Sequence, residues 1–328
     1  MSEPQYARYV ALGDSQTEGL CDGDEATGYR GWADRLAEYL AELNPDVRYA
    51  NLAVRGSLAA DIRRQQLEPA LAMRPDLATV VAGMNDLLRP SFDAEEVAGE
   101  IEAMFAALTS AGARVATITF PKIGEIVPLA RPLLPRVIAL NARIDQAAAR
   151  HGVAVLETYH NSVTTDHRLW SPDRLHASPL GHSLIAAGMA DTLGLPGSNA
   201  TWSDPLPQLA ERSTLGMAAT ELRWMATFFG PWVGRRIRGK SSADRRTAKR
   251  PELVTCTGRP RARDNRAIDD HLRMRHVDAI ALEERAGQPV RGGGGIVEHA
   301  GGSQQCRTGR AGQSPPRRHA PQPAGDLG

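Results

Sequence analysis

The sequence predicts a three-layer α/β/α domain over residues 2–196, built on a five-stranded parallel sheet with helices on both faces. Two observations lead to this fold class. Short apolar segments alternate with segments of helical periodicity, which is typical of βαβ units. The strand segments are continuously apolar, as in a sheet that is covered on both faces. Because such crossovers are right-handed, the carboxyl ends of the strands meet at one edge of the sheet.

The individual elements follow from apolar runs and helical spacing. Strands are predicted at 9–12, 47–52, 77–82, 114–120 and 153–156. Helices are predicted from Trp32 to Leu43, from Ser57 as N-cap through Leu71, from Asp93 to Gly112, over 135–150, and from Gly181 to Leu193. Between Ser15 and Trp32 the chain is polar and contains glycine, so a loop is expected there.

The composition changes after the predicted domain. Residues 205–240 combine apolar and aromatic side chains with a basic end, which predicts an amphipathic helix. Its aromatic face either docks on the α/β domain, or the stretch 224–240 makes a peripheral contact with anionic membrane. Residues 241–328 are rich in Arg, Gly, Pro and Gln and contain no aromatic residue, so a disordered basic tail is expected. One hypothesis for this tail is an out-of-frame extension of the gene.

Bulk properties exclude several classes of protein. The net charge of the 328 residues is +1, which gives no general argument for binding nucleic acid. Three cysteines, widely spaced at Cys21, Cys256 and Cys306, indicate neither a disulfide framework nor a metal site. The first eight residues lack the features of a signal peptide, and no apolar run reaches the length of a membrane span. We therefore expect a cytoplasmic location.

Ser15 lies where the first strand ends, in Gly13-Asp14-Ser15, and this is the edge at which α/β folds bind ligands. The same tripeptide is also ordinary turn chemistry. A nucleophilic serine needs a base, and the base needs a group that orients it. In Asp173-Arg174-Leu175-His176 a spacing of three stacks the two side chains on one helical turn. The alternative is that Asp173 caps a helix and His176 is a surface residue.

Gly56 and Asn85 follow the second and third predicted strands. A glycine lets the backbone approach a ligand closely, and an amide side chain donates hydrogen bonds, so both are candidate donors to an oxyanion. Each is also compatible with plain turn chemistry. His182 begins an apolar helix, so packing or capping is its expected role.

Taken in order, four blocks carry a family resemblance. They are Gly13-Asp14-Ser15, Gly56, Gly83-Met84-Asn85-Asp86 and Asp173-Arg174-Leu175-His176. Together they resemble the GDSL esterase/lipase family, the SGNH hydrolases, over about residues 8–193. The Gly-x-Ser-x-Gly elbow of α/β-hydrolases is absent around Ser15, as the resemblance implies. Residues after about 193 lie outside the shared blocks.

The resemblance implies a flavodoxin-like fold and a role for each block. Ser15 is the nucleophile and a backbone donor of the oxyanion hole. Gly56 supplies a second backbone donor, and Asn85 a side-chain donor. Asp173 and His176 complete the triad, with His176 as base.

The expected activity is that of a serine esterase acting on small acyl esters, with no cofactor, metal or nucleic acid. The alternatives are an acyltransferase that uses the same acyl-enzyme and a membrane-associated binding protein with an inert pocket. Loops 16–31, 87–93 and 123–134 are expected to shape the pocket. A mild preference for short uncharged acyl groups follows from the resemblance.

Overall fold

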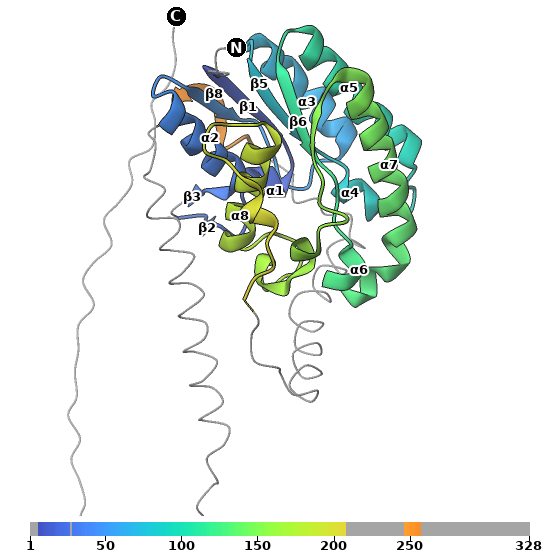
Figure 1. The fold of residues 1–328 in the computed structure, drawn as a ribbon. Helices are drawn as coiled ribbons and strands as arrows, with labels where there is room; N and C mark the ends of the chain where they lie inside the picture. Colours follow the sequence, from blue (N-terminus) through green and yellow to red (C-terminus); the bar gives the residue numbers. More distant parts are fainter. Residues whose placement is uncertain (1–5, 27, 208–245, 257–328) are drawn as a thin grey trace, which may run out of the picture. The chain divides into compact units, whose positions relative to one another are not determined.

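The computed structural model describes residues 6–26, 28–207 and 246–256, all of which belong to one compact unit. Its main sheet has six strands (Figure 1). The strands are β1 (Arg8–Gly13), β4 (Arg48–Asn51), β5 (Leu77–Val81), β6 (Arg114–Ile118), β7 (Ala154–Leu156) and β8 (Arg250–Thr255). A separate two-stranded hairpin is formed by β2 (Gly23–Asp24) and β3 (Gly28–Tyr29).

The strand order is β7-β6-β5-β1-β4-β8, and the first five strands of this order pair in parallel. Without β8 this is the flavodoxin-like order, in which the chain runs from β1 to β4 on one side and then to β5 on the other. The predicted α/β fold class is therefore confirmed. The change of direction between β1 and β5 is the topological switch point, and Ser15 lies directly beyond it.

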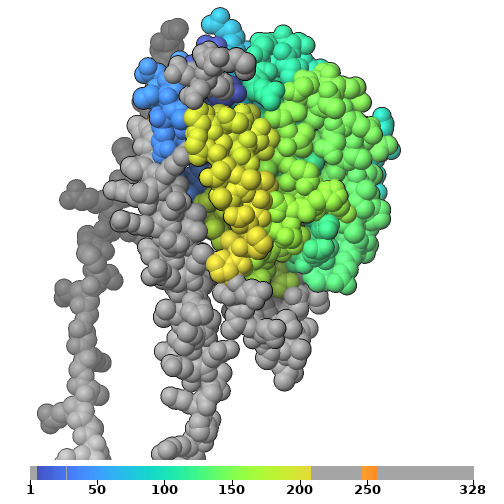
Figure 2. All heavy atoms as spheres, viewed as in Figure 1, coloured from blue at the N-terminus to red at the C-terminus, as the bar shows by residue number. Residues whose placement is uncertain are grey.

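In the part of the chain that the structure describes, long helices cover both faces of the sheet (Figure 1). They are α2 (Gly31–Leu43), α3 (Ala59–Ala72), α5 (Ala94–Ser110), α7 (Leu134–His151) and α8 (Pro179–Thr192). Val10 and Leu12 of β1 pack with the cluster that includes α3, α5 and α7. Tyr9 and Ala11 pack on the other face with α2 and α8. Both faces are buried, which explains why the strands are apolar without alternation. Figure 2 shows α8 at the surface, in yellow, beside α2 in blue.

Shorter elements occupy the connections. They are α1 (Ser15–Glu18), α4 (Met84–Leu87), α6 (Ile123–Ile126) and the 3₁₀ helices η1 (Pro128–Leu133), η2 (Ser162–Thr165), η3 (His167–Leu169) and η4 (Ala200–Ser203). The loop predicted directly after Ser15 is therefore wrong. Asp14 caps α1, because its carboxylate accepts from the Gln16 amide at 3.1 Å. The predicted cap at Ser57 is also wrong: Leu58 is the N-cap of α3, and the Ser57 hydroxyl donates to the Val54 carbonyl at 2.8 Å.

Strand β8 shows that two predictions are wrong, the number of strands and the disorder of the whole tail. The sheet has six strands instead of five, and residues 246–256 of the expected disordered tail form an ordered segment. β8 pairs antiparallel with β4, with Tyr49 opposite Val254. It lies at the end of the strand order, where Pro251 removes no essential ladder bond. Averaging composition over 241–328 hides this short segment. The predictions for 208–245 and 257–328 concern residues outside the described part of the chain.

The folded part also extends past the predicted boundary at residue 196. Trp202 of η4 packs against the core on the α2 and α8 face, and its indole donates to Asp191 at 3.2 Å. In the ranges that the structure describes, none of the helices combines the length and the apolar character needed to cross a membrane.

Candidate active site

A tight turn places Ser15 at the carboxyl end of β1. The Gln66 side chain accepts from the Gly13 amide and donates to the Gly13 carbonyl, each at 2.9 Å, and so fixes the end of the strand. A Cβ on Gly13 would lie 2.3 Å from the Thr17 hydroxyl oxygen and 2.9 Å from the Val81 carbonyl oxygen. Only glycine fits there, so the chain turns at once into α1 with Ser15 as its first residue.

Ser15, His176 and Asp173 form a continuous series of hydrogen bonds. The distance from His176 Nε2 to Ser15 Oγ is 2.9 Å, and that from His176 Nδ1 to Asp173 Oδ2 is 2.7 Å. The structure thus brings together three side chains that the sequence places up to 161 residues apart. Both ends of the imidazole are engaged, with the carboxylate on one side and the hydroxyl on the other.

The segment that carries Asp173 and His176 is a turn, so the predicted helical turn is wrong. Arg174 has φ +58°, which breaks a right-handed helix. Asp173 Oδ1 accepts from the amides of Leu175 at 2.8 Å and His176 at 3.0 Å. One carboxylate oxygen therefore holds the turn, and the other is left to orient the imidazole.

Gln16 attaches this turn to α1, a role that the sequence did not reveal. Its side-chain nitrogen donates to the Leu175 carbonyl at 3.0 Å, and its oxygen accepts from the Ala177 amide at 3.2 Å. These two residues flank His176. Gln16, the residue after Ser15, therefore fixes the backbone on both sides of His176.

The Asp173–His176 couple favours a protonated imidazole. Burial opposes the charge on the ring, but the hydrogen bond and the charge of Asp173, together with nearby Cys21, raise the pKa of His176 to about 10. The pKa of Asp173 lies well below its usual range: burial acts to raise it, and the hydrogen bond and charge of His176 outweigh that effect. The carboxylate therefore stabilises the cation that forms when the ring accepts a proton.

Asn85 is the second residue of α4, and Gly56 lies in the turn that follows β4. The Asn85 amide nitrogen donates to Asp14 Oδ2 at 3.0 Å and to the Ser57 carbonyl at 3.1 Å. Gly56 has φ +82°, a left-handed conformation that suits glycine. Burial raises the pKa of Asp14 to about 6, while its hydrogen bonds from Gln16 and Asn85 act in the opposite direction. The loops after β1, β4 and β5 are thus joined through Asp14, Ser57 and Asn85.

A buried ion pair also fixes the loop of Gly56. The Arg55 guanidinium pairs with the Glu18 carboxylate at the end of α1, and the Arg55 amide donates to Glu18 Oε2 at 2.8 Å. Both side chains are buried. This pair ties the turn at residues 54–57 to the helix that begins with Ser15.

The loop after α1 brings Cys21 to the Asp173 carboxylate, a contact that no sequence pattern predicts. Cys21 Sγ lies 3.9 Å from Asp173 Oδ2. Buried His182 holds the preceding residue, donating from Nε2 to the Leu20 carbonyl at 2.9 Å and accepting from the Trp32 amide at 3.2 Å. Burial lowers the pKa of His182 to about 4. The packing role predicted for His182 is confirmed.

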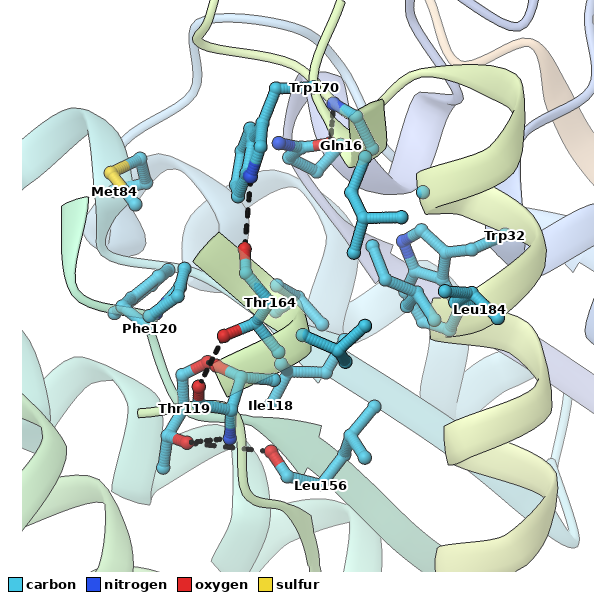
Figure 3. Close-up of a pocket in the computed structure, with 18 of the residues that line it drawn as sticks. Gln16, Trp32, Met84, Ile118, Thr119, Phe120, Leu156, Thr164, Trp170 and Leu184 are labelled. Atoms are coloured by element: carbon cyan, nitrogen blue, oxygen red, sulfur yellow. Dashed lines mark hydrogen bonds between the residues drawn. The ribbon is translucent and has the colours of Figure 1, made fainter. Parts of the chain in front are cut away.

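An apolar pocket opens beside Ser15 and contains a cavity of about 90 Å³. Figure 3 shows Gln16 and Trp170 at one end, Thr119 and Leu156 at the other, and Trp32 and Leu184 across from Phe120. Asp14 and Gln16 flank Ser15, and Ala177 follows His176; all three line the pocket.

Most of the pocket wall comes from segments that the sequence did not single out. Among the described residues of the three loops predicted to shape it, Gln16 of loop 16–31 lines the pocket, and loops 87–93 and 123–134 do not; the larger contributions come from residues 118–121, residues 156–170 and α8. The Trp170 indole donates to the Thr164 carbonyl at 3.0 Å, which folds this irregular stretch over the sheet edge. Tertiary contacts of this kind leave no periodic pattern in the sequence.

Comparison with known proteins identifies the family of the chain. The family model of the GDSL-like lipase/acylhydrolase family matches residues 11–184, more than half of the chain. The chain belongs to this family. The resemblance to the SGNH hydrolases is thereby confirmed. No curated protein sequence matches the chain significantly.

The solved structures to which the chain is similar have low sequence identity. An Axe2 variant, an acetyl xylan esterase from Geobacillus stearothermophilus, has 17% identity and a TM-score of 0.51, with 61% of this chain and 100% of that chain covered. LAE5, an alpha/beta hydrolase enzyme from the metagenome of Lake Arreo, has 20% identity and a TM-score of 0.49, with 57% of this chain and 95% of that chain covered. The psychrotrophic esterase EstA from Pseudoalteromonas sp. has 18% identity and a TM-score of 0.46, with 57% of this chain and 96% of that chain covered.

Proposed function

We propose that this member of the GDSL-like acylhydrolase family is a serine esterase that works through an acyl-enzyme on Ser15. The observation that supports it is the hydrogen-bonded series from Asp173 through His176 to Ser15, with distances of 2.7 and 2.9 Å. A base within hydrogen-bond reach of the hydroxyl, oriented by a third group, is the arrangement that activates a serine.

The proposed reaction has two half-reactions. Ser15 Oγ attacks the ester carbonyl carbon while His176 Nε2 takes the hydroxyl proton. The tetrahedral intermediate collapses, the bond to the leaving alcohol breaks, and the imidazolium returns the proton to that alcohol. Water then attacks the acyl-enzyme with His176 again acting as base, which releases the carboxylic acid and restores Ser15. Asp173 stabilises the imidazolium in both steps.

The proposed oxyanion hole consists of the Ser15 and Gly56 amides and the Asn85 side chain. Its support is the placement of all three at neighbouring strand ends. The Asn85 amide is held in one orientation by Asp14 and the Ser57 carbonyl, at 3.0 and 3.1 Å. An oxyanion would share or replace one of these acceptors, so the donor is oriented before the substrate binds.

The pocket supports an uncharged, short acyl group as the substrate. A cavity of 150 Å³ accommodates benzene, so the cavity of about 90 Å³ here suits roughly three or four carbon atoms. Its wall consists mainly of apolar side chains such as Phe120, Leu156 and Trp202. A negatively charged acyl group would lose its hydration there, and the residues that line the pocket include no basic side chain to replace it.

Steady-state hydrolysis of p-nitrophenyl esters tests the proposal on the full chain. Ser15→Ala and His176→Ala are expected to abolish nearly all activity, and Ser183→Ala, a surface serine on α8, is the matched control. Butyrate is expected to be the preferred chain among acetate, butyrate, octanoate and laurate. Activity retained in Ser15→Ala would refute the proposal.

Two related questions have simple readouts. Transfer of the acyl group to an added alcohol, detected as a new ester product, would establish the acyltransferase alternative. We also propose a cytoplasmic location, which the free thiols of Cys21 and Cys256 support because a reducing compartment keeps such groups unpaired. Cell fractionation of the native organism tests this location.

A further inference from the structure

Three side chains that can bind a metal ion, a thiol, a carboxylate and the imidazole of His176, lie close together. Cys21, Asp173 and His176 each present one ligating atom, and these atoms lie within 4.8 Å of one another. The Cys21 Sγ to Asp173 Oδ2 distance is 3.9 Å, and the His176 Nδ1 to Asp173 Oδ2 distance is 2.7 Å. All three residues are partly exposed, so solvent cations reach them. The proposed esterase reaction assigns no step to the Cys21 thiol.

This set of a sulfur, a nitrogen and an oxygen is the set that zinc prefers. Zn²⁺ binds Cys, His and carboxylate ligands tetrahedrally, often with three protein ligands and one water. Bond lengths of 2.0–2.3 Å imply ligand-to-ligand distances of about 3.3–3.6 Å. The two measured distances, 2.7 and 3.9 Å, bracket that range. Small side-chain rotations are enough to complete the site.

Hydrogen bonds and an ion pair on the flanking residues hold Cys21 and Asp173 in place. Cys21 lies between Leu20, whose carbonyl accepts from His182 at 2.9 Å, and Asp22, which pairs with Arg35 at 2.8 Å. On the other side, Asp173 Oδ1 is occupied by the turn amides, so Oδ2 is the oxygen that faces the thiol. A cation therefore meets a set of ligands that is already assembled.

We propose that Cys21, Asp173 and His176 form an inhibitory Zn²⁺ site in this protein. Zinc binds the thiolate sulfur, Asp173 Oδ2 and His176 Nδ1. The thiol proton and the Nδ1 proton pass to solvent, the hydrogen bond between Asp173 and His176 is lost, and the single proton of the neutral ring resides on Nε2. An imidazole bound to zinc through Nδ1 therefore has no lone pair on Nε2 with which to take the Ser15 proton. Inhibition depends on the proposed esterase function, whereas zinc binding does not.

The test combines binding and activity in the full chain. Cd²⁺ serves as the binding probe, because cadmium bound to a thiolate absorbs in the ultraviolet, and Zn²⁺ serves as the inhibitor of p-nitrophenyl butyrate hydrolysis. Cys21→Ser is the test variant and Cys256→Ser the matched control. His160→Ala controls for the exposed His160–Glu157 pair, at 3.1 Å.

The proposal predicts a cadmium absorption band in the wild type, in Cys256→Ser and in His160→Ala, and its loss in Cys21→Ser. It also predicts inhibition by Zn²⁺ that EDTA reverses. The zinc concentration for half-inhibition, measured relative to each variant's own activity without zinc, rises about tenfold or more in Cys21→Ser. If Cys21→Ser fails to fold, zinc should still protect Cys21 of the wild type from alkylation by iodoacetamide, as located by mass spectrometry.

The overturning results are equally specific. A cadmium band that persists in Cys21→Ser, an unchanged zinc sensitivity of that variant, or alkylation of Cys21 at the same rate with and without zinc would each refute the site. An inactive wild type that still gives a Cys21-dependent cadmium band would refute the esterase function and leave the metal site standing.

Discussion

Replacing Lys249 tests whether the unexpected strand β8 is part of the fold in solution. Lys249 lies just before β8, and its ammonium donates to the carbonyls of Tyr29 at 2.8 Å and Arg30 at 3.0 Å, and to that of Glu18. It also pairs with Asp34 Oδ2 at 2.6 Å, with the two side chains only 18% and 11% exposed. These contacts join residues 246–256 to the loop that follows α1.

The expected cost follows from this burial. Removing one partner of a buried ion pair leaves an uncompensated charge, so Lys249→Met is expected to lower the free energy of unfolding by about 3–5 kcal/mol. Replacing both partners, as in Lys249→Met with Asp34→Asn, should recover a large part of that loss. The matched control is Arg143→Met, which removes the pair with Glu95 whose side chains are 37% and 82% exposed. It should cost less than about 1 kcal/mol.

The pH dependence gives the prediction a second readout. Burial raises the pKa of Asp34 to about 6 even though Lys249 acts to lower it. Without Lys249 this pKa rises further, so the folded state binds a proton that the unfolded state has already lost. The stability of Lys249→Met should therefore fall as the pH rises from about 5 to about 8, and more steeply than that of the wild type.

Urea unfolding followed by circular dichroism measures these free energies. Agreement of Lys249→Met with the wild type to within about 0.5 kcal/mol at pH 8 would refute the reasoning, since surface substitutions typically stay within that limit. A double variant no more stable than Lys249→Met would show that the loss does not come from the Asp34 charge.

Three further predictions concern catalysis and are read from steady-state kinetics. Asn85→Ala should lower kcat by about 10²–10³, the loss typical of one oxyanion donor, and an unchanged kcat would remove Asn85 from the oxyanion hole. Because Asp173 and Cys21 raise the pKa of His176 to about 10, kcat/KM should still be rising with pH at about pH 9; a plateau from about pH 7 would contradict that value. Leu184→Trp should fill the pocket and shift the preferred ester from butyrate to acetate by several-fold, whereas Leu184→Ala should favour octanoate; identical profiles would place the acyl chain elsewhere.

The sequence predicts the parallel core well because both faces of the sheet are buried. Tyr9, Val10, Ala11 and Leu12 read as one apolar run since alternate residues enter two different clusters. The end of this run in Gly13-Asp14-Ser15 predicts Ser15 directly after the first strand, and the structure has it there as the first residue of α1. The resemblance implies Asp173 and His176 as its partners, and the structure brings the three side chains together.

The features that the sequence did not predict share a physical cause. Each of them depends on contacts between side chains and backbone groups that come together only in the fold. Gln16 and Cys21 reach the catalytic turn only after β1 and the segment before α8 meet at the sheet edge. Residues 246–256 form a strand because β4 offers an edge and Asp34 offers a buried countercharge for Lys249. The turn at Asp173 replaces the predicted helix because its side chain hydrogen-bonds to backbone amides two and three residues on.

Covalent labelling with a fluorophosphonate, followed by mass spectrometry, tests the central claim most directly. The hydrogen bond of 2.9 Å between His176 and Ser15 predicts a single adduct on Ser15, none in Ser15→Ala, and much slower labelling in His176→Ala. A wild type that is not labelled on Ser15, or labelling of His176→Ala as fast as that of the wild type, would contradict the account.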